Sequence, residues 1–147
     1  MARYETTIHT PWSAERAFEY MSDLRHFADW DPGVNRVVQI LGRAPGLGST
    51  YDVTVASPGR DLTLRYETVS FDAPRRIEVR AQSQTLLSVD VVTVAPDDPT
   101  GAVVTYTAEL SLRGFLAVAS PLLGLAFNRI GDRAAKGLRH ALEATTP

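Results

Sequence analysis

Residues 62–67 read Leu-Thr-Leu-Arg-Tyr-Glu, and this alternation of apolar and polar side chains decides the fold. Successive side chains of a β-strand point to opposite faces of a sheet, so the stretch predicts a strand with one dry face and one wet face. The same kind of pattern recurs at 34–41, 50–56, 76–83, 86–95 and 102–112. Only short turn segments separate these stretches, whereas a parallel crossover needs a dozen or more residues. The sequence therefore predicts consecutive strands in a mostly antiparallel sheet.

The dry face of this predicted sheet can be written out strand by strand. It comprises Tyr51, Val53 and Val55; Leu62, Leu64 and Tyr66; Ile77, Val79 and Ala81; Leu87, Val89 and Val91; and Val104, Tyr106, Ala108, Leu110 and Leu112. Ser88 and Asp90 are assigned to the opposite, wet face. Acid–base catalysis on a buried apolar substrate needs a titratable group that faces inward. Because this dry face has no Asp, Glu, Lys, Arg or His, the pattern argues against an enzyme.

Helical patterns flank the strands. After a first strand at 4–10, Ser13 is expected to cap a short helix, and a second short helical piece is expected at 24–29. A long helix is expected from Gly114 onward, and Pro121 is expected to kink or reset it. This helix is the only long element that can cover the dry face, which predicts an α+β fold with the sheet wrapped around it. The pattern leaves open whether side chains fill the space between them or a ligand shares it.

The composition limits the class of protein. A length of 147 residues, an apolar share of 44% and a net charge of -2 fit one globular domain over 1–147. Scattered basic residues argue against nucleic acid as a partner. The chain has no cysteine, which removes disulfides and Cys-ligated metals. The most apolar stretch, 114–128, is too short for a membrane span and the first residues lack a signal-peptide pattern, so we expect a cytoplasmic protein.

Few residues suggest catalysis or metal binding. His9, His26 and His140 are the only imidazoles, and none has the spacing of a helical metal pair, so no metal site is expected. His26 could reach the mouth of a pocket and act as an acid or base, but an exposed surface position is the commoner one for such a histidine. Asp29 and Asp31 flank Trp30 and could in principle transfer protons, but capping and turn formation are the commoner roles of such residues.

Three local motifs resemble those of a known superfamily. The first strand leads into Thr-Pro-Trp-Ser-Ala-Glu-Arg-Ala-Phe at 10–18, where a proline and a small polar residue precede a buried aromatic. The segment Phe-Ala-Asp-Trp-Asp-Pro-Gly-Val at 27–34 resembles an aromatic-Trp-x-Pro segment before the second strand, and 41–51 resembles a Gly-x-Gly turn into the third. In this order the motifs resemble the START-like (SRPBCC) superfamily of polyketide cyclase/dehydrase and lipid-transport proteins.

The resemblance implies a helix-grip fold, in which a curved seven-stranded antiparallel sheet surrounds a long C-terminal helix and two short helices separate the first two strands. It also implies an internal cavity for a small hydrophobic ligand, such as a lipid, isoprenoid or polyketide, without a cofactor. The expected ligand-binding residues are Phe27, Trp30, Tyr51, Tyr66, Tyr106, Leu123 and Phe127, with Phe27 and Trp30 near the mouth. Binding or transport is the first functional hypothesis. The alternatives are a polyketide cyclase/dehydratase-type enzyme and a protein-interaction module.

Overall fold

The structure of the chain is a computed structural model that describes residues 2–56, 59–97, 99–114 and 120–144, without the side chains of residues 120–123. Its strands are β1 (Ala2–Thr10), β2 (Val34–Leu41), β3 (Thr50–Val55), β4 (Leu62–Asp72), β5 (Arg76–Gln82), β6 (Leu86–Asp97) and β7 (Gly101–Leu112). Its helices are α1 (Ala14–Ser22), the 3-10 turn η1 (Leu24–His26), α2 (Phe27–Trp30) and α3 (Ser120–Glu143). The α+β helix-grip prediction is confirmed.

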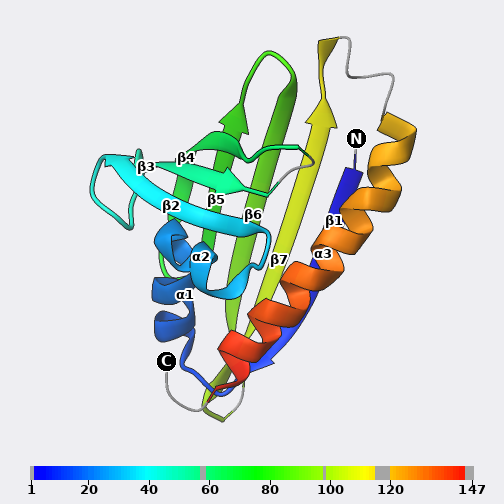
Figure 1. Cartoon of the computed structure of the whole chain (residues 1–147). Coiled ribbons are helices and arrows are strands. Elements are labelled where there is room, and N and C mark those ends of the chain that lie inside the picture. Colours follow the sequence, from blue (N-terminus) through cyan, green and yellow to red (C-terminus); the bar gives the residue numbers. More distant parts are fainter. Residues whose placement is uncertain (1, 57–58, 98, 115–119, 145–147) are drawn as a thin grey trace.

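All seven strands form one antiparallel sheet in the order β1-β7-β6-β5-β4-β3-β2. Strands β2 to β7 follow one another as a meander, and β1 closes the far side by pairing with β7. Register shifts in β2 and β4 mark bulges, which increase the local bend of a strand. The result is a curved sheet whose concave face receives the helices (Figure 1).

Two groups of helices lie on this face. The short helix α1 lies on β6 and β7, α2 contacts β2, and α3 runs along β1 (Figure 1). Ser13 caps α1 by accepting a hydrogen bond from the amide of Arg16 at 3.2 Å, as its position in the sequence predicted. The buried residues of α3 include Leu138 and Leu142, which are completely removed from solvent.

Two glycines let α3 approach its neighbours closely. A Cβ atom on Gly137 would lie 1.9 Å from the carbonyl oxygen of Trp30, and one on Gly131 would lie 2.3 Å from the ring of Tyr4. At the other end of the helix, the Trp12 indole donates a hydrogen bond to the carbonyl of Ala144 at 2.6 Å. This contact satisfies a carbonyl at the helix end and fixes that end against the start of α1.

The last helix is described from Ser120 to Glu143. Its predicted start at Gly114 is followed by residues 115–119, which lie outside the described residues, so the predicted effect of Pro121 on the helix stays a prediction. The short helical piece expected at 24–29 consists of two elements, η1 and α2, that together reach Trp30.

Candidate functional site

A cavity of about 270 Å³ lies between the sheet and α3. Most of its wall is apolar, and the strands β1, β3, β4, β6 and β7 all contribute to it. Its lining includes Tyr4, Thr6, Phe27, Trp30, Asp31, Val53, Leu64, Tyr66, Ser88, Asp90, Tyr106, Ala108, Leu110, Phe127, Ile130 and Arg133. The volume is slightly below the 300 Å³ or so that is usual for sites of drug-sized ligands, so it suits a small molecule.

The inner face of β6 is shifted by one residue from its prediction. Leu86, Ser88, Asp90, Val92 and Val94 are buried, whereas Leu87, Val89 and Val91, which were assigned to the dry face, are only partly buried. The prediction that no ionisable residue faces inward is therefore wrong. Residues directly opposite each other on paired strands share a face, and Asp90 lies opposite both Val79 and Ala108. The pairing with β5 and β7 thus determines the face of the sheet on which Asp90 lies, which the sequence of β6 alone leaves open.

Asp90 is the most unusual residue of the cavity wall. It is only 7% exposed, and the hydroxyl of Tyr106 donates a hydrogen bond to its Oδ2. Burial raises the pKa of the Asp90 carboxyl to about 7, although the bond from Tyr106 lowers it and the nearby Asp31 adds to the rise. A carboxyl group with this pKa can both take up and release a proton near neutral pH.

A second hydrogen-bonded pair joins β4 to β6 across the intervening strand β5. The Tyr66 hydroxyl and Ser88 Oγ are 2.6 Å apart and buried, and either can be the donor. The pKa values of Tyr66 and Tyr106 are both raised, chiefly by burial. The negative charge of Asp90 is the second cause for each. Both phenols therefore remain neutral hydrogen-bonding groups at physiological pH.

Asp31 and Arg133 complete the polar part of the lining. Asp31 is partly buried and accepts a hydrogen bond from the Gly33 amide at 2.9 Å. Its pKa is raised by burial, against the opposing effects of this bond and of the Arg133 charge. Arg133 is an exposed residue of α3. Two acidic side chains and one basic side chain thus line the cavity within the described parts of the chain.

Three aromatic rings pack together at one side of the cavity. The Trp30 ring centroid lies 4.8 Å from that of Phe27 and 5.6 Å from that of Tyr106. Trp30 is only 3% exposed, and its Nε1 has no hydrogen-bond acceptor among the described residues. A buried donor without an acceptor is uncommon, but this nitrogen has almost no accessible surface, so the ring of Trp30 and not its Nε1–H borders the cavity.

The structure places most of the predicted site residues together. Phe27, Trp30, Tyr66, Tyr106 and Phe127 line the cavity. Tyr51 is completely buried and is not part of the lining, and its hydroxyl has no partner among the described residues. The Leu123 side chain lies outside the described residues.

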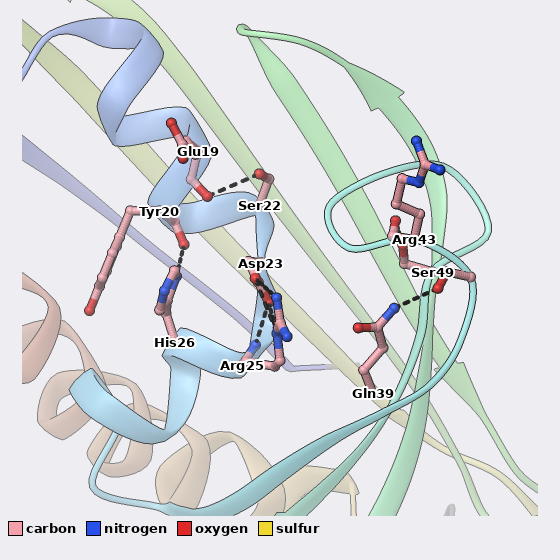
Figure 2. Close-up of polar contacts among 10 residues, drawn as sticks. Glu19, Tyr20, Ser22, Asp23, Arg25, His26, Gln39, Arg43 and Ser49 are labelled. Carbon is pink, nitrogen blue, oxygen red and sulfur yellow. Dashed lines mark hydrogen bonds and ion pairs between the residues drawn. The ribbon is translucent and has the colours of Figure 1, made fainter.

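His26 and Asp29 are not part of the cavity wall. Figure 2 shows His26 directed toward the backbone of α1, where its Nδ1 lies 2.8 Å from the Tyr20 carbonyl oxygen. In the same view the Asp23 carboxylate accepts hydrogen bonds from the Arg25 amide and guanidinium, which fixes the turn into η1 (Figure 2). Within the described ranges, no three His, Cys, Asp or Glu side chains gather as a metal site would require. No helix in the part of the chain that the structure describes is long and apolar enough to cross a membrane.

Comparison with known proteins places this geometry in a family. A family model described as polyketide cyclase/dehydrase and lipid transport matches residues 1–143. A START superfamily protein from Mycobacterium smegmatis superposes with a TM-score of 0.78 at 14% identity, over 97% of both chains. The ZhuI aromatase/cyclase from Streptomyces sp. R1128 gives a TM-score of 0.75 at 15% identity, over 95% of this chain and 90% of that chain.

A more distant structural neighbour is norcoclaurine synthase from Thalictrum flavum, solved with a transition-state analogue. It superposes with a TM-score of 0.62 at 19% identity, over 95% of both chains. At these identities the structural likeness concerns the fold alone. No curated protein sequence matches the chain. The match of the family model over nearly the whole length shows that the chain belongs to the polyketide cyclase/dehydrase and lipid-transport family of START-like proteins.

Proposed function

We propose that the protein binds a small, mostly apolar molecule in the cavity between sheet and α3, with the polar end of the ligand at Asp90. The observation that carries this proposal is an apolar cavity with a small polar cluster on one wall. Small-molecule sites commonly combine a hydrophobic lining with a few polar groups that fix the orientation of the ligand. The family description, which names lipid transport, supports the same function.

The polar cluster offers both kinds of hydrogen-bonding group. Asp90 supplies acceptor oxygens, and Tyr66 and Ser88 supply hydroxyl groups. A purely aliphatic ligand would leave Asp90 with the Tyr106 hydroxyl as its one donor among the described residues, which is costly for a buried carboxyl group. The preferred ligand therefore has one polar end and an apolar body.

Calorimetric titration with phenylbutanol, a neutral probe of this kind, tests the proposal. The wild type is expected to bind it with a measurable dissociation constant, and Ala108→Phe is expected to abolish binding because a ring at that position occupies the cavity. Val91→Phe is the matched control, because Val91 lies on the outer face of β6 and does not line the cavity. Equal binding by both variants, or none by the wild type, would contradict the proposal.

A second function is favoured by a specific observation, the inward carboxyl of Asp90. Its raised pKa suits a general base or acid, and it faces a cavity that can hold a carbonyl compound. We propose as the alternative a cyclase or dehydratase type of reaction, in which the Asp90 carboxylate removes a proton next to a carbonyl and the Tyr66 hydroxyl donates a hydrogen bond to the enolate oxygen.

Proton exchange in deuterated water tests this alternative without knowledge of the natural substrate. The carboxylate would take a proton from the carbon beside the carbonyl of benzylacetone, and the enolate would then take up a deuteron from solvent. The rate should rise with pH through about 7 as Asp90 ionises, and Asp90→Asn should abolish the increase. Exchange at the same rate in wild type and Asp90→Asn would remove the alternative and leave the binding function intact.

A further inference from the structure

The charges on the cavity wall point to the electrical charge of the ligand. We propose that the cavity selects molecules whose polar end is positively charged, such as an aliphatic or arylalkyl amine, through the carboxylates of Asp90 and Asp31 and the aromatic rings beside them. This inference rests on the proposed binding function, because it specifies the ligand of the same cavity.

The Asp90 carboxylate has fewer partners than an ionised carboxyl group can accept. Its two oxygens offer about four acceptor positions, and among the described residues only the Tyr106 hydroxyl donates a hydrogen bond to them. None of the described Lys, Arg or His side chains forms an ion pair with it within 4.0 Å. Buried charges in proteins are normally paired. An ammonium group in the cavity would supply both the opposite charge and the hydrogen bonds.

The aromatic rings beside Asp90 favour the same charge. Phe27, Trp30 and Tyr106 all line the cavity and contact one another in tilted or edge arrangements. The face of an aromatic ring carries partial negative charge and attracts an ammonium group, most strongly in the case of tryptophan. A carboxylate bonded to Tyr106, with Phe27 and Trp30 packed against that ring, is a suitable receptor for an amine whose carbon chain lies in the apolar part of the cavity.

Arg133, the one basic residue among the described lining residues, does not cancel the negative charge of the cavity wall. Arg133 lies on the exposed side of α3, and its charge lowers the pKa of Asp31, so the two neutralise each other in part. Asp90 then remains as the uncompensated charge deep in the wall. An anionic ligand such as a fatty acid would bring a second negative charge to this carboxylate and is expected to bind weakly.

The pH dependence of binding has a defined sign. The groups that face Asp90 are Tyr106 on β7, Tyr66 on β4, Asp31 before β2, and, at the edge of the lining, Tyr4 on β1 and Arg133 on α3. The pKa values of the three tyrosines are raised, so they stay neutral below pH 9 or so. Asp90 ionises near neutral pH. Affinity for an amine should therefore increase as the pH rises through about 7 and level off above it.

Three probes with the same carbon skeleton separate charge from hydrophobic fit. Phenylbutylamine is cationic, phenylbutanol is neutral and phenylbutyrate is anionic, and each is titrated into the full chain by calorimetry. At about pH 8 we expect the amine to bind at least about tenfold more tightly than the alcohol, since hydrogen bonds between charged groups are the stronger ones. The butyrate should bind most weakly.

Two variants assign the selectivity to Asp90. Asp90→Asn keeps the shape of the side chain and should remove both the preference for the amine and its pH dependence. Asp29→Asn is the matched control, because it removes one negative charge from α2 at an exposed position that does not line the cavity. That control should retain the preference of the wild type.

The outcomes distinguish this inference from the function on which it rests. If none of the three probes binds, the binding function itself is wrong. If the alcohol binds as tightly as the amine at about pH 8, or the butyrate binds most tightly because Arg133 dominates, the cavity binds ligands but the charge selectivity is overturned. Retention of the amine preference in Asp90→Asn would overturn the role of the carboxylate.

Discussion

The two ends of α3 lie over the same sheet but cover different interiors. Near the C-terminal end of the helix, the inner residues Ile8, Ala102, Val104 and Leu142 are all buried, and we call this region the solid half. Near the other end, the inner residues Tyr4, Thr6, Tyr106, Ala108, Leu110 and Phe127 retain exposed surface, and we call this region the hollow half. The change occurs within single strands, between Val104 and Tyr106 on β7.

The difference between the halves lies in the size and polarity of the inward side chains. In the hollow half, α3 presents Gly131, Ala134 and Ala135 to the cavity, and small side chains leave space that their neighbours do not fill. The sheet presents Ser88 and Asp90 at positions where the solid half has Val92 and Val94. One alternating pattern thus forms a packed core at one end and a polar recess at the other, and the recess has the mixed lining that is common in small-molecule sites.

Removal of a large side chain should have the greatest effect in the solid half. Leu142→Ala deletes a side chain with no exposed surface, and such changes cost about 2–5 kcal/mol of unfolding free energy. Phe127→Ala in the hollow half should cost less than about 2 kcal/mol, because this ring is only partly buried and already borders a cavity. Urea unfolding of both variants measures the difference. Equal losses would mean that the two halves are packed alike.

The pH dependence of stability should reveal the charge in the hollow half. The pKa of Asp90 is about 7 in the folded chain and lies near 3.8 when unperturbed. Between these values the folded state holds more protons than the unfolded state, so ionisation of Asp90 lowers the stability as the pH rises, by a total on the order of 4 kcal/mol. Asp90→Asn lacks this loss. The difference in unfolding free energy between wild type and variant should therefore change across pH 4 to 7 or so and be constant above.

That experiment also has a contradicting result. A difference between wild type and Asp90→Asn that is independent of pH would show that the carboxyl titrates normally and is exposed to water. The acidic residues with lowered pKa values, among them Asp23, Asp52 and Glu78, affect both proteins equally and cancel in the comparison.

The contact of α3 with α2 lies between the two halves and should be sensitive to a single methyl group. Gly137→Ala places a Cβ against the backbone oxygen of Trp30, where no side chain can move aside, and should destabilise by about 1–3 kcal/mol. Gly124→Ala is the matched control in the same helix. Its Cβ would meet nothing within 4 Å, so better helix propensity should stabilise it by up to about 1 kcal/mol. Thermal unfolding distinguishes them, and a stabilised Gly137→Ala variant would contradict the close contact.

The sequence predicted the strictly alternating strands better than β6, whose inner face was predicted wrongly in both halves. Strict alternation, as in 62–67, was enough to predict the strands and their order, because an amphipathic strand has one low-energy orientation. In β6, apolar residues occupy both faces, with Leu86 beside Leu87 and Val91 beside Val92. The alternation within this strand therefore does not identify its inner face, and the predicted inner face is wrong. Asp90 was therefore missed as a site residue. The register across strands, with Val79 and Ala108 opposite it, carried the missing signal.

The aromatic part of the site was predictable for a different reason. Phe27 and Trp30 belong to a motif that resembles the family, and the same motif contains Asp31, which was interpreted as a turn residue. It does serve the turn through the Gly33 amide, but it also lines the cavity. When a residue has both a common and a less common role, the sequence alone predicts only the common role.

A pair of identical substitutions on one strand tests the contrast between the halves most directly. Ala102 and Ala108 both point inward from β7, but Ala102 has no exposed surface, whereas Ala108 lines the cavity. Ala108→Phe should change the unfolding free energy by less than about 1 kcal/mol, because the ring enters existing space, and Ala102→Phe should cost about 1–3 kcal/mol or more through overpacking. Equilibrium urea unfolding of the two variants measures both values. Equal costs for the two substitutions would contradict the account, since they would mean that no space exists beneath α3 for a ligand.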